Sequence, residues 1–469
     1  MISWHDIIII SQWFFLIYFL AINSCYLMLN IFSTLYVRSY MPGKTLEELP
    51  QIYSGLELPI SILVPAYNEE KSIASSIQSM LQLNYPLFEI IVINDESTDG
   101  TLRELIEKFS LVPFPEAYRA HLKTAAILGI YCSTRHPNLR VIDKRNGGKA
   151  DALNAGINAA RYPLFCAVDA DSVLQRTSLQ RIVRPFLEDH RVVAAGGTIR
   201  VGNGCKISGG FLQEIRLPSN PLALLQVVEY LRAFLFGRLG WSYIGGLLII
   251  SGAFGLFRKE TVIAVGGYHI DTVGEDMELV LRIHRVLRKN KKAYRMVFLP
   301  DPVAWTEVPE DFRSLMNQRA RWQRGLSESL IGNIGLLFSR NGGAPGWIAF
   351  PFMILFEWLG PVIEVSGYIL MITLYWLGLL SVTAFLVFIF AAIGLSLLAS
   401  FSSLLLEEVS FHMYKRPRHL ALIMVTVIIE NFGFRQLNSI WRLYGLIQWM
   451  VYRKRNWGAM KRKEHWEKG

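Results

Sequence analysis

The chain has 469 residues, of which 52% are hydrophobic and only 18% are charged. This apolar share is high for a purely soluble protein and predicts membrane-spanning helices beside one or more soluble domains. The formal net charge of +10 fits either nucleic-acid binding or a membrane protein whose Lys and Arg residues gather in cytoplasmic loops. The four cysteines lack the spacing of a zinc site or a disulfide framework, so neither is expected.

Residues 1–40 are predicted to form an N-terminal transmembrane helix. Residues 7–37 are almost all apolar or aromatic, which is longer than the apolar core of a signal peptide. Arg38 and Lys44 follow this tract, and a positive flank of this kind places the next domain in the cytoplasm. Residues 41–59 are predicted to be a polar linker.

Residues 60–330 are predicted to form a soluble α/β domain. Four apolar runs have the composition of buried strands, and each is followed by a polar turn and a helical pattern. Short, repeated units of strand, turn and helix are typical of a doubly wound α/β fold. The strands are expected at residues 60–64, 89–93, 139–142 and 165–168, and the first helix at 68–81.

Four segments of this domain depart from the simple alternation. Residues 117–131 are predicted to be a helical insertion. Residues 221–240 are predicted to be an amphipathic helix, which either lies in the membrane interface or packs in a core. Residues 247–257 are expected to form a buried strand and turn, and an amphipathic helix is expected from about 275 to 289.

Polar side chains follow the predicted strands at the points where the strands end. Because the carboxyl ends of parallel strands meet at one edge of a sheet, Asp95, Lys149, Asp169 and Asp171 should line a single crevice. Two neighbouring carboxylates need a cation to neutralise them, and oxygen ligands on a loop suit Mg²⁺ or Mn²⁺. A lone Asp-x-Asp sequence is also typical of an exposed loop after a strand, so the pair alone leaves both interpretations open.

Lys149 follows two glycines at the expected start of a helix, where backbone amides and an ammonium group can face an anion. The run is not a phosphate-binding loop of the Walker type, because Asp143 replaces the first glycine of that motif and Ala150 replaces its Ser or Thr. Carboxylates for a metal and a lysine for phosphate together suit a nucleoside diphosphate.

A second polar motif, Gln318-Arg319-Ala320-Arg321-Trp322, lies before the later apolar tracts. On a helix, Gln318, Arg321 and Trp322 share one face. An indole offers a flat platform for a sugar ring, while Arg and Gln side chains can bind diphosphate oxygens or hydroxyl groups. The alternative is a basic amphipathic helix that Trp322 anchors at a membrane surface.

The remaining sequence is dominated by two apolar tracts. Residues 346–406 are predicted to form two transmembrane helices, followed by a basic cytoplasmic loop at 407–419. Residues 420–452 form an apolar tract that polar residues interrupt near its middle. Basic clusters flank the tract on both sides. A single crossing would place one cluster outside the cell, so a membrane hairpin or re-entrant segment is predicted, followed by a basic cytoplasmic tail at 453–469.

Together these motifs resemble the processive membrane branch of the family-2 glycosyltransferases, which includes the cellulose, hyaluronan, chitin and poly-N-acetylglucosamine synthases. The resemblance covers residue 60 to about residue 325, and the motifs occur in the family's order. They are Pro65-Ala66-Tyr67-Asn68-Glu69, Asp95-Glu96-Ser97-Thr98-Asp99-Gly100, Gly148-Lys149-Ala150 with Leu153-Asn154, Asp169-Ala170-Asp171, Gly274-Glu275-Asp276 and Gln318-x-x-Arg321-Trp322. The resemblance implies a GT-A-type doubly wound catalytic domain inserted between transmembrane α-helices.

The resemblance also implies roles for residues on the donor side. Asp95 would hold the uridine, and Lys149 would lie near the nucleotide or diphosphate. Asp169 and Asp171 would engage the diphosphate and its Mg²⁺ or Mn²⁺, with Asp171 as the direct metal ligand.

On the acceptor side, Asp276 matches the general base of the family, which removes the proton from the attacking hydroxyl group. Gln318, Arg321 and Trp322 would hold the diphosphate and the acceptor sugar, and Ser251-Gly252 falls where the family lines the acceptor site.

The expected function is therefore that of a membrane-embedded, metal-dependent, inverting glycosyltransferase, which transfers a sugar from a UDP-sugar to a growing β-linked polysaccharide. The alternatives are a non-processive transferase that acts on a lipid acceptor and an inactive scaffold or exporter that binds nucleotide. Two features depart from the family pattern. Gly274 stands where many members have Thr. The membrane part is smaller than in pore-forming members, so an accessory or export subunit is a possible partner.

The location expected is the cell membrane, with several spans and a cytoplasmic catalytic domain. Nucleic acid is not expected as a partner, because the basic residues cluster beside the apolar tracts.

Overall fold

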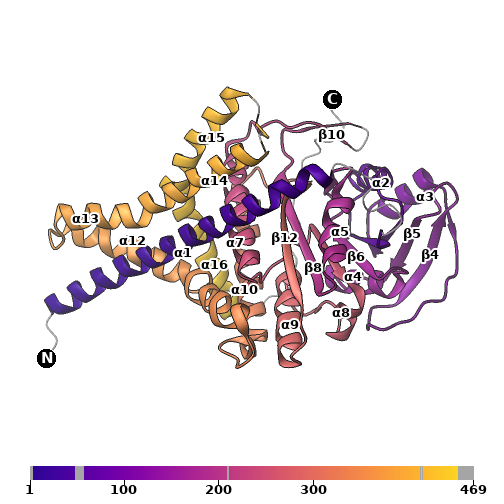
Figure 1. Cartoon of the computed structure of the whole chain (residues 1–469), viewed down its shortest axis with the longest axis horizontal. Helices are drawn as coiled ribbons and strands as arrows, with labels where there is room; N and C mark the ends of the chain where they lie inside the picture. The colour runs from indigo at the N-terminus through magenta and orange to yellow at the C-terminus, as the bar shows by residue number, and fades with distance from the viewer. Residues whose placement is uncertain (1–3, 48–56, 209–210, 412, 415, 453–469) are drawn as a thin grey trace.

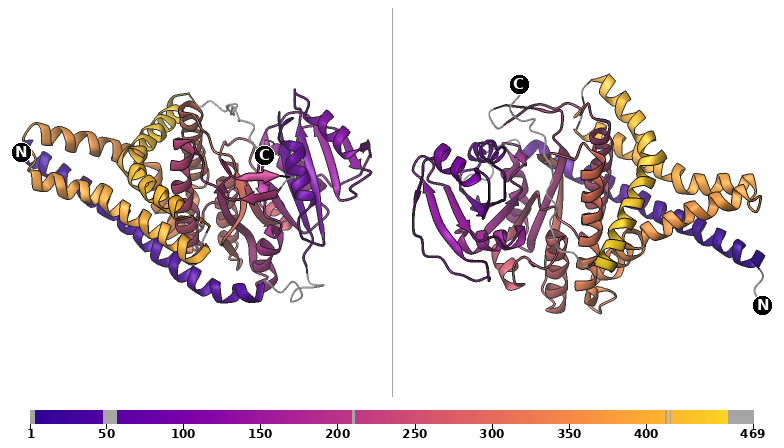
Figure 2. Two further views of the ribbon diagram at one scale, coloured as in Figure 1. Left: turned by 90° about the horizontal axis from the view of Figure 1, so that it is seen from above. Right: turned by 180° about the vertical axis from the view of Figure 1, so that it is seen from behind.

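The computed structural model describes residues 4–47, 57–208, 211–411, 413–414 and 416–452. An α/β domain built on one large sheet occupies one end, and long apolar helices extend away from its side (Figure 1). Figure 2 shows the same division from two further directions. The predicted fold class is confirmed, with one difference in the direction of the strands.

In the described part of the chain, the domain is organised around a ten-stranded sheet in the order β3-β4-β5-β2-β1-β6-β11-β8-β12-β7. The neighbours β5, β2, β1 and β6 run parallel, whereas β11 is antiparallel to both β6 and β8. The sheet is therefore mixed. Its strands are β1 (Ile60–Ala66), β2 (Phe88–Asp95), β3 (Leu111–Pro113), β4 (Ile127–Ser133), β5 (Leu139–Lys144), β6 (Leu164–Val168), β7 (Val173–Leu174), β8 (Val192–Val201), β11 (Phe254–Arg258) and β12 (Arg295–Thr306).

The four predicted strands are confirmed as β1, β2, β5 and β6. Their residues are buried almost without interruption, as expected for strands in the middle of a sheet that is covered on both faces. Helix α4 packs on β1 and β2, and α5 packs on β8 and β12. The helices of this domain are α2 (Ile73–Leu81), α3 (Thr101–Phe109), α4 (Lys149–Ala159), α5 (Ser178–Glu188), α8 (Lys259–Ala264), α9 (Glu275–Lys289) and α10 (Phe312–Gly332).

The prediction of a helix at residues 117–131 is wrong. Residues 127–133 form β4, which pairs antiparallel with β5 and extends the sheet, and β3 pairs with its other edge. The helix predicted from residue 68 begins only at Ile73, and Asn68 lies before it in a left-handed conformation with φ of 57°. The Asn68 side chain accepts a hydrogen bond from the Thr98 amide at 2.7 Å, so this segment clamps the loop after β2.

The apolar helices begin with α1 (Trp4–Glu47), which runs along the other apolar helices and reaches the α/β domain (Figures 1 and 2). Near its end, the Tyr40 hydroxyl donates a hydrogen bond to Asp301 of β12 at 2.5 Å. The remaining elements of this part are η3 (Pro345–Ala349), α11 (Phe350–Phe352), η4 (Met353–Trp358), α12 (Gly360–Trp376), α13 (Val382–Ile389), η5 (Phe390–Gly394), α14 (Leu395–Phe411), α15 (Pro417–Ile429), η6 (Glu430–Phe434) and α16 (Arg435–Tyr452).

Among the described residues, three helices are long and apolar enough to cross a membrane: Asp6–Tyr40, Val382–Phe411 and Pro417–Val451. A fourth candidate is the pair Pro345–Trp358 and Gly360–Trp376, which is bent by 45° at its break. The assignment of these helices as membrane spans, with the boundaries given above, stays a prediction.

The segment predicted as a hairpin, 420–452, forms α15 and α16 joined at a kink, where Gly433 has φ of 126°. Helix α16 packs on α10 of the α/β domain and on α12, whereas α15 packs on α14 and on α6 (Pro221–Tyr230). Its topology in a membrane stays a prediction.

The predicted helix at 221–240 is present as α6, η1 (Leu231–Arg238) and α7 (Leu239–Tyr243). It contacts α1, α14 and α15, and its place at a membrane surface stays a prediction. Residues 41–47 of the predicted linker continue helix α1. Residues 48–56 of that linker, His412 and Lys415 of the predicted loop, and the predicted tail 453–469 lie outside the described residues.

Candidate active site

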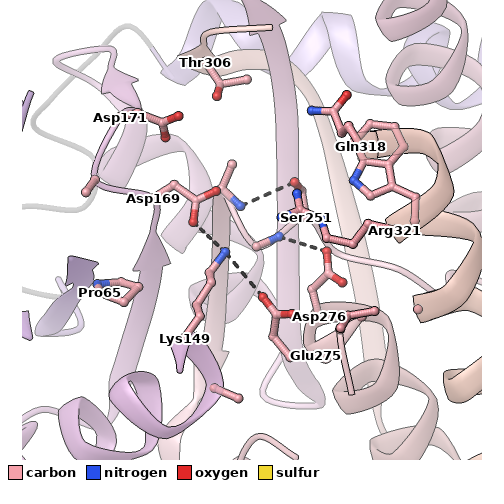
Figure 3. A pocket seen from close by; sticks show the side chains of 18 of the residues that line it. Pro65, Lys149, Asp169, Asp171, Ser251, Glu275, Asp276, Thr306, Gln318 and Arg321 are labelled. Carbon is pink, nitrogen blue, oxygen red and sulfur yellow. Dashed lines mark hydrogen bonds and ion pairs between the residues drawn. The ribbon is translucent and has the colours of Figure 1, made fainter. Parts of the chain in front are cut away.

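A pocket of about 1810 Å³ opens at the edge of the sheet where β1, β2, β5 and β6 end. Each residue that the sequence predicted for the site lines this pocket, so the structure brings the whole set together (Figure 3). They are Asp95, Lys149, Asp169, Asp171, Ser251, Gly252, Asp276, Gln318, Arg321 and Trp322.

The register of β11 explains why the segment Ser251-Gly252 reaches this edge. Phe254, the first residue of β11, pairs with Val168, the last residue of β6. Because the two strands are antiparallel, the residues before β11 lie beside the residues after β6, which include Asp169. The Gly252 position is close to Lys149, since a Cβ atom there would approach Nζ to 3.0 Å.

Lys149 is the centre of an ion cluster at the floor of the pocket. Its Nζ lies 2.6 Å from Asp169 Oδ1 and 3.4 Å from Glu275 Oε1 (Figure 3). Burial acts to lower the pKa of Lys149, but the two carboxylates outweigh it and raise that pKa above its ordinary value. Burial in turn raises the pKa of Glu275, and the Lys149 charge opposes that rise. The ammonium group is therefore held charged at the start of α4.

Lys149 is presented by a turn that favours glycine. Gly148 has φ of 84° and precedes the first helical residue, and its amide donates a hydrogen bond to Asp95 Oδ2 at 2.8 Å. Asp95 also accepts a hydrogen bond from Lys144 Nζ at 2.6 Å. Burial raises the pKa of Asp95, and Lys144 and the glycine amides oppose that rise. Asp95 is only 3% exposed, so its contacts within the chain shape the loop before Lys149.

The two carboxylates after β6 differ in their surroundings. Asp169 is partly exposed and paired with Lys149, whereas Asp171 is 8% exposed. Among the described residues, no group of three or more His, Cys, Asp or Glu side chains could hold a metal ion. Two carboxylates nonetheless fit Mg²⁺ or Mn²⁺, because such ions are commonly bound by one or two carboxylates together with substrate phosphates and water. The donor set suits a metal that arrives with a nucleoside diphosphate.

Asp276 faces the pocket from the first turn of α9. Its Oδ2 accepts a hydrogen bond from the Gly252 amide at 3.2 Å, and its Oδ1 accepts one from the Met277 amide at 2.8 Å. Both bonds come from backbone amides, and Figure 3 shows the Asp276 side chain across the pocket from Asp171. Backbone amides thus orient this carboxylate, and its charge also acts on nearby Arg321.

Helix α10 supplies the opposite wall. Gln318 is 8% exposed, and its Oε1 is buried without a hydrogen-bond partner among the described residues. Burial lowers the pKa of Arg321, while the charges of nearby Glu275, Asp169 and Asp276 oppose that change. Trp322 lines the pocket and is 45% exposed. A flat apolar ring beside a cation and an amide suits a sugar with an attached phosphate.

Close packing explains why position 274 is occupied by glycine. A Cβ atom at Gly274 would lie 2.8 Å from the Gly325 Cα atom, and a Cβ atom at Gly325 would lie 2.8 Å from the Gly274 Cα atom. The two backbones therefore touch directly, which brings the start of α9 close to α10. A threonine at 274 would not fit in this arrangement without moving one of the helices.

Several pocket residues were missed or given no role by the sequence analysis. Glu275 was noted only as part of a motif, although it pairs with Lys149. The signal for most of the others was a charged or polar side chain within an apolar helical tract. They are Glu229, Arg238, Thr306, Arg319, Asn438 and Arg442.

Comparison with known proteins identifies the family. The family model described as "Glycosyl transferase family 2" matches residues 61–119, and the model described as "Glycosyltransferase like family 2" matches residues 131–325. Poly-beta-1,6-N-acetyl-D-glucosamine synthase of Staphylococcus aureus (strain COL) is 30% identical over 275 residues, which cover 58% of this chain and 55% of that protein. The chain thus matches about half the length of this relative.

Two solved structures resemble this chain at low identity. A mannosyltransferase from Pyrobaculum calidifontis in complex with GDP-Man and Mn²⁺ has a TM-score of 0.49 at 17% identity, over 93% of this chain and 100% of that one. TarS of S. aureus (residues 1–349) in complex with UDP-GlcNAc has a TM-score of 0.39 at 16% identity, over 81% and 92%. The two family models thus show that the chain contains a glycosyltransferase family 2 domain, matched over residues 61–119 and 131–325.

Proposed function

We propose that this protein is an inverting glycosyltransferase that transfers a sugar from a UDP-sugar to a growing β-linked polysaccharide at a membrane. The observation that carries the proposal is the arrangement of the pocket, in which groups suited to a leaving diphosphate face a carboxylate and an indole suited to an acceptor sugar. The similarity to a poly-β-1,6-N-acetylglucosamine synthase supports UDP-N-acetylglucosamine as the first donor to test.

On the donor side, Lys149 and Arg321 would stabilise negative charge on the departing UDP. Asp169 and Asp171 would hold Mg²⁺ or Mn²⁺, which, when bound, neutralises charge on the diphosphate. Asp95 would contact the uridine, although its described hydrogen bonds also fix the loop before Lys149.

On the acceptor side, Asp276 would take the proton of the attacking hydroxyl group. Its two backbone hydrogen bonds orient the carboxylate toward the pocket without neutralising it. Trp322 and Gln318 would hold the acceptor sugar, and Ser251-Gly252 would line the same subsite. A single displacement inverts the anomeric centre, so an α-linked donor gives a β-linkage.

The long apolar helices support a membrane location, with the catalytic domain in the cytoplasm where UDP-sugars are used. The acceptor would be a glycan, or a lipid in the non-processive alternative, and an accessory or export subunit would complete the system.

The test is release of UDP by the purified full-length protein from a panel of UDP-sugars that includes UDP-N-acetylglucosamine. We expect release from at least one donor, loss of release on removal of divalent cations, and products that contain many sugars. Absence of UDP release with every donor would overturn the proposal, and a single-sugar glycolipid product would replace its processive part.

A further inference from the structure

A buried charge pair lies beside the acceptor-side wall, and the proposed chemistry does not use it. Arg319 of α10 and Glu229 of α6 approach to 2.5 Å between Nη2 and Oε2. Arg319 is 1% exposed and is one of the largest fully buried side chains among the described residues. Burying such a pair is costly, because both charges lose their contact with water.

Arg319 also stacks on the predicted sugar platform. Its Cζ atom lies 4.2 Å from the centre of the Trp322 ring, a distance at which the cation is attracted to the indole face. The two residues are three apart on α10 and therefore neighbours on its surface. The guanidinium covers part of an indole that is still 45% exposed, so the orientation of the ring is set from its buried side.

Glu229 keeps the guanidinium in this place. Arg319 Nε and Nη1 are buried without hydrogen-bond partners among the described residues, so the pair with Glu229 carries much of the compensation for the charge. The other oxygen of Glu229 accepts a weak hydrogen bond from Asn438 Nδ2 of α16 at 3.5 Å. The stack is thus braced from two helices other than its own.

We propose that Arg319, held by Glu229, is a positioning residue that fixes the Trp322 indole for stacking against an acceptor sugar. The proposal rests on the function proposed above, in which Trp322 carries the acceptor. The ligand is a neutral hydroxylated sugar ring, for which a fixed aromatic face provides stacking. If the pair served only to tie α6 to α10, its loss would lower stability without a selective effect on the sugar.

The experiment is equilibrium binding of a fluorescently labelled β-linked N-acetylglucosamine pentasaccharide to the full-length protein in detergent, with UDP and Mn²⁺ present. Arg319→Lys retains the charge but loses the planar group over the ring, and it should weaken pentasaccharide binding about tenfold. Affinity for UDP should not change. Glu229→Gln, which removes the anion, should act in the same direction and serves as a second variant if Arg319→Lys does not fold.

A double-mutant cycle separates positioning from stability. Trp322→Leu should weaken pentasaccharide binding by itself, and adding Arg319→Lys should cause no further loss if Arg319 acts through the indole. Arg140→Lys is the matched control, because Arg140 is 4% exposed, pairs with Glu89 at 2.6 Å and does not line the pocket. This control should bind both ligands like the parent.

Unchanged pentasaccharide affinity in Arg319→Lys and Glu229→Gln, additive losses in the cycle, or the same loss in Arg140→Lys would each overturn the proposal. So would a parent protein that does not bind the pentasaccharide. Release of UDP from UDP-sugars is measured separately, so failure of the proposed function and failure of this inference give different results.

Discussion

At the scale of single residues, the carboxylates of the pocket have the same chemistry but differ in the groups that contact them. Asp169 and Glu275 share the Lys149 ammonium group, whereas Asp276 is bonded only to backbone amides in the contacts described above. Asp276 is thus oriented by backbone donors, and its charge also acts on nearby Lys149, Arg238 and Arg321. These surroundings are compatible with the proposed roles of Asp276 as the base and of Asp169 as part of the diphosphate site.

Asp276→Asn should abolish sugar transfer and leave UDP binding largely intact. The amide keeps the size of the side chain but is a far weaker base, so the chemical step fails while the donor site is unaffected. UDP release measures the first effect, and calorimetric titration with UDP and Mn²⁺ measures the second. Substantial turnover by this variant would exclude Asp276 as the base.

Asp171→Ala should weaken the metal-dependent part of UDP binding. The variant removes a carboxylate that would hold the divalent ion, so UDP affinity with Mn²⁺ should fall toward the affinity measured with a chelator. Glu188→Ala is the control, because it removes a half-exposed carboxylate at the end of α5 that does not line the pocket. The control should bind UDP like the parent. Equal UDP affinity in Asp171→Ala and the parent would contradict the assignment.

His284 predicts a dependence of stability on pH. Its ring is buried between the Tyr294 hydroxyl at 2.5 Å and the Leu247 carbonyl at 2.7 Å, and burial lowers its pKa to about 4. The folded pKa lies below the unfolded value of about 6.5, so the folded state prefers the neutral ring. The resulting stability is complete above pH of about 6.5 and is lost as the pH falls toward 4.

The apparent melting temperature should therefore fall between pH 7 and pH 5. The full effect of the ring is on the order of 3 kcal/mol. His284→Gln can still donate a hydrogen bond to Leu247 but does not titrate, so its melting temperature should depend less on pH in this range. Identical slopes for the parent and the variant would show that other groups cause the pH dependence.

At the scale of elements, the contact of Gly274 with Gly325 brings the start of α9, which carries the proposed base Asp276, close to α10, which carries Trp322. The start of α9 and helix α10 touch through backbone atoms there, because neither glycine has a side chain. The distance between Asp276 and Trp322 therefore depends on both residues being glycine. Sequence spacing cannot reveal this contact, because the two glycines are far apart in the chain. It accounts for the glycine that stands before the Glu-Asp pair.

Gly325→Ala should reduce transfer strongly while the protein still folds. The added methyl group would lie 2.8 Å from the Gly274 Cα atom, so α9 and α10 must shift apart. Asp276 on α9 would then move relative to Trp322 on α10, which disturbs the geometry of the reacting groups. Gly332→Ala is a matched control on the same helix, because a Cβ atom there meets nothing within 4 Å. UDP release and melting temperature should be measured for both variants. Equal activity of the two would contradict this role of the contact.

The failed prediction at residues 117–131 also belongs to this scale. Ile127, Ile130 and Tyr131 are compatible with a helix or a strand, and the segment is too short for its periodicity to decide. It becomes a strand because the edge of β5 is available for pairing. A tertiary contact therefore overrode an ambiguous local pattern.

At the scale of the whole molecule, the C-terminal helix links the apolar helices to the site. Gly445 of α16 lies against the Ala320 backbone of α10, where a Cβ atom would approach the carbonyl oxygen to 2.5 Å. Arg442 of α16 donates a hydrogen bond to Gln323 of α10 at 2.9 Å and lines the pocket. Helix α16 is thus packed against the catalytic domain.

We predict a cytoplasmic C-terminus from this packing and from the charge pattern. We expect Lys461, which lies outside the described residues, to be on the same side of the membrane as the catalytic domain. Cysteine labelling in intact cells, with a residue in a loop of the catalytic domain as the cytoplasmic control, measures its side. Labelling of position 461 from outside the cell would contradict the prediction.

By itself, the sequence determined the central strands, the apolar helices and many residues of the pocket. Each of these depends on local patterns: buried runs such as Phe165–Val168, long apolar tracts, and short motifs placed where strands end. Because parallel strands present their carboxyl ends at one edge, the convergence of Asp95, Lys149 and Asp169 could be expected from the amino-acid sequence alone.

Only the tertiary structure decided which of these groups pair. The antiparallel register of β11, the contact between Gly274 and Gly325, and the stack of Arg319 on Trp322 join segments or orient side chains in ways that no local pattern encodes. These contacts depend on how whole elements pack, since the partner of a buried charge is set by which helix lies beside it. The sequence therefore indicates which residues lie in the pocket, and the packing of whole elements determines which of them contact each other.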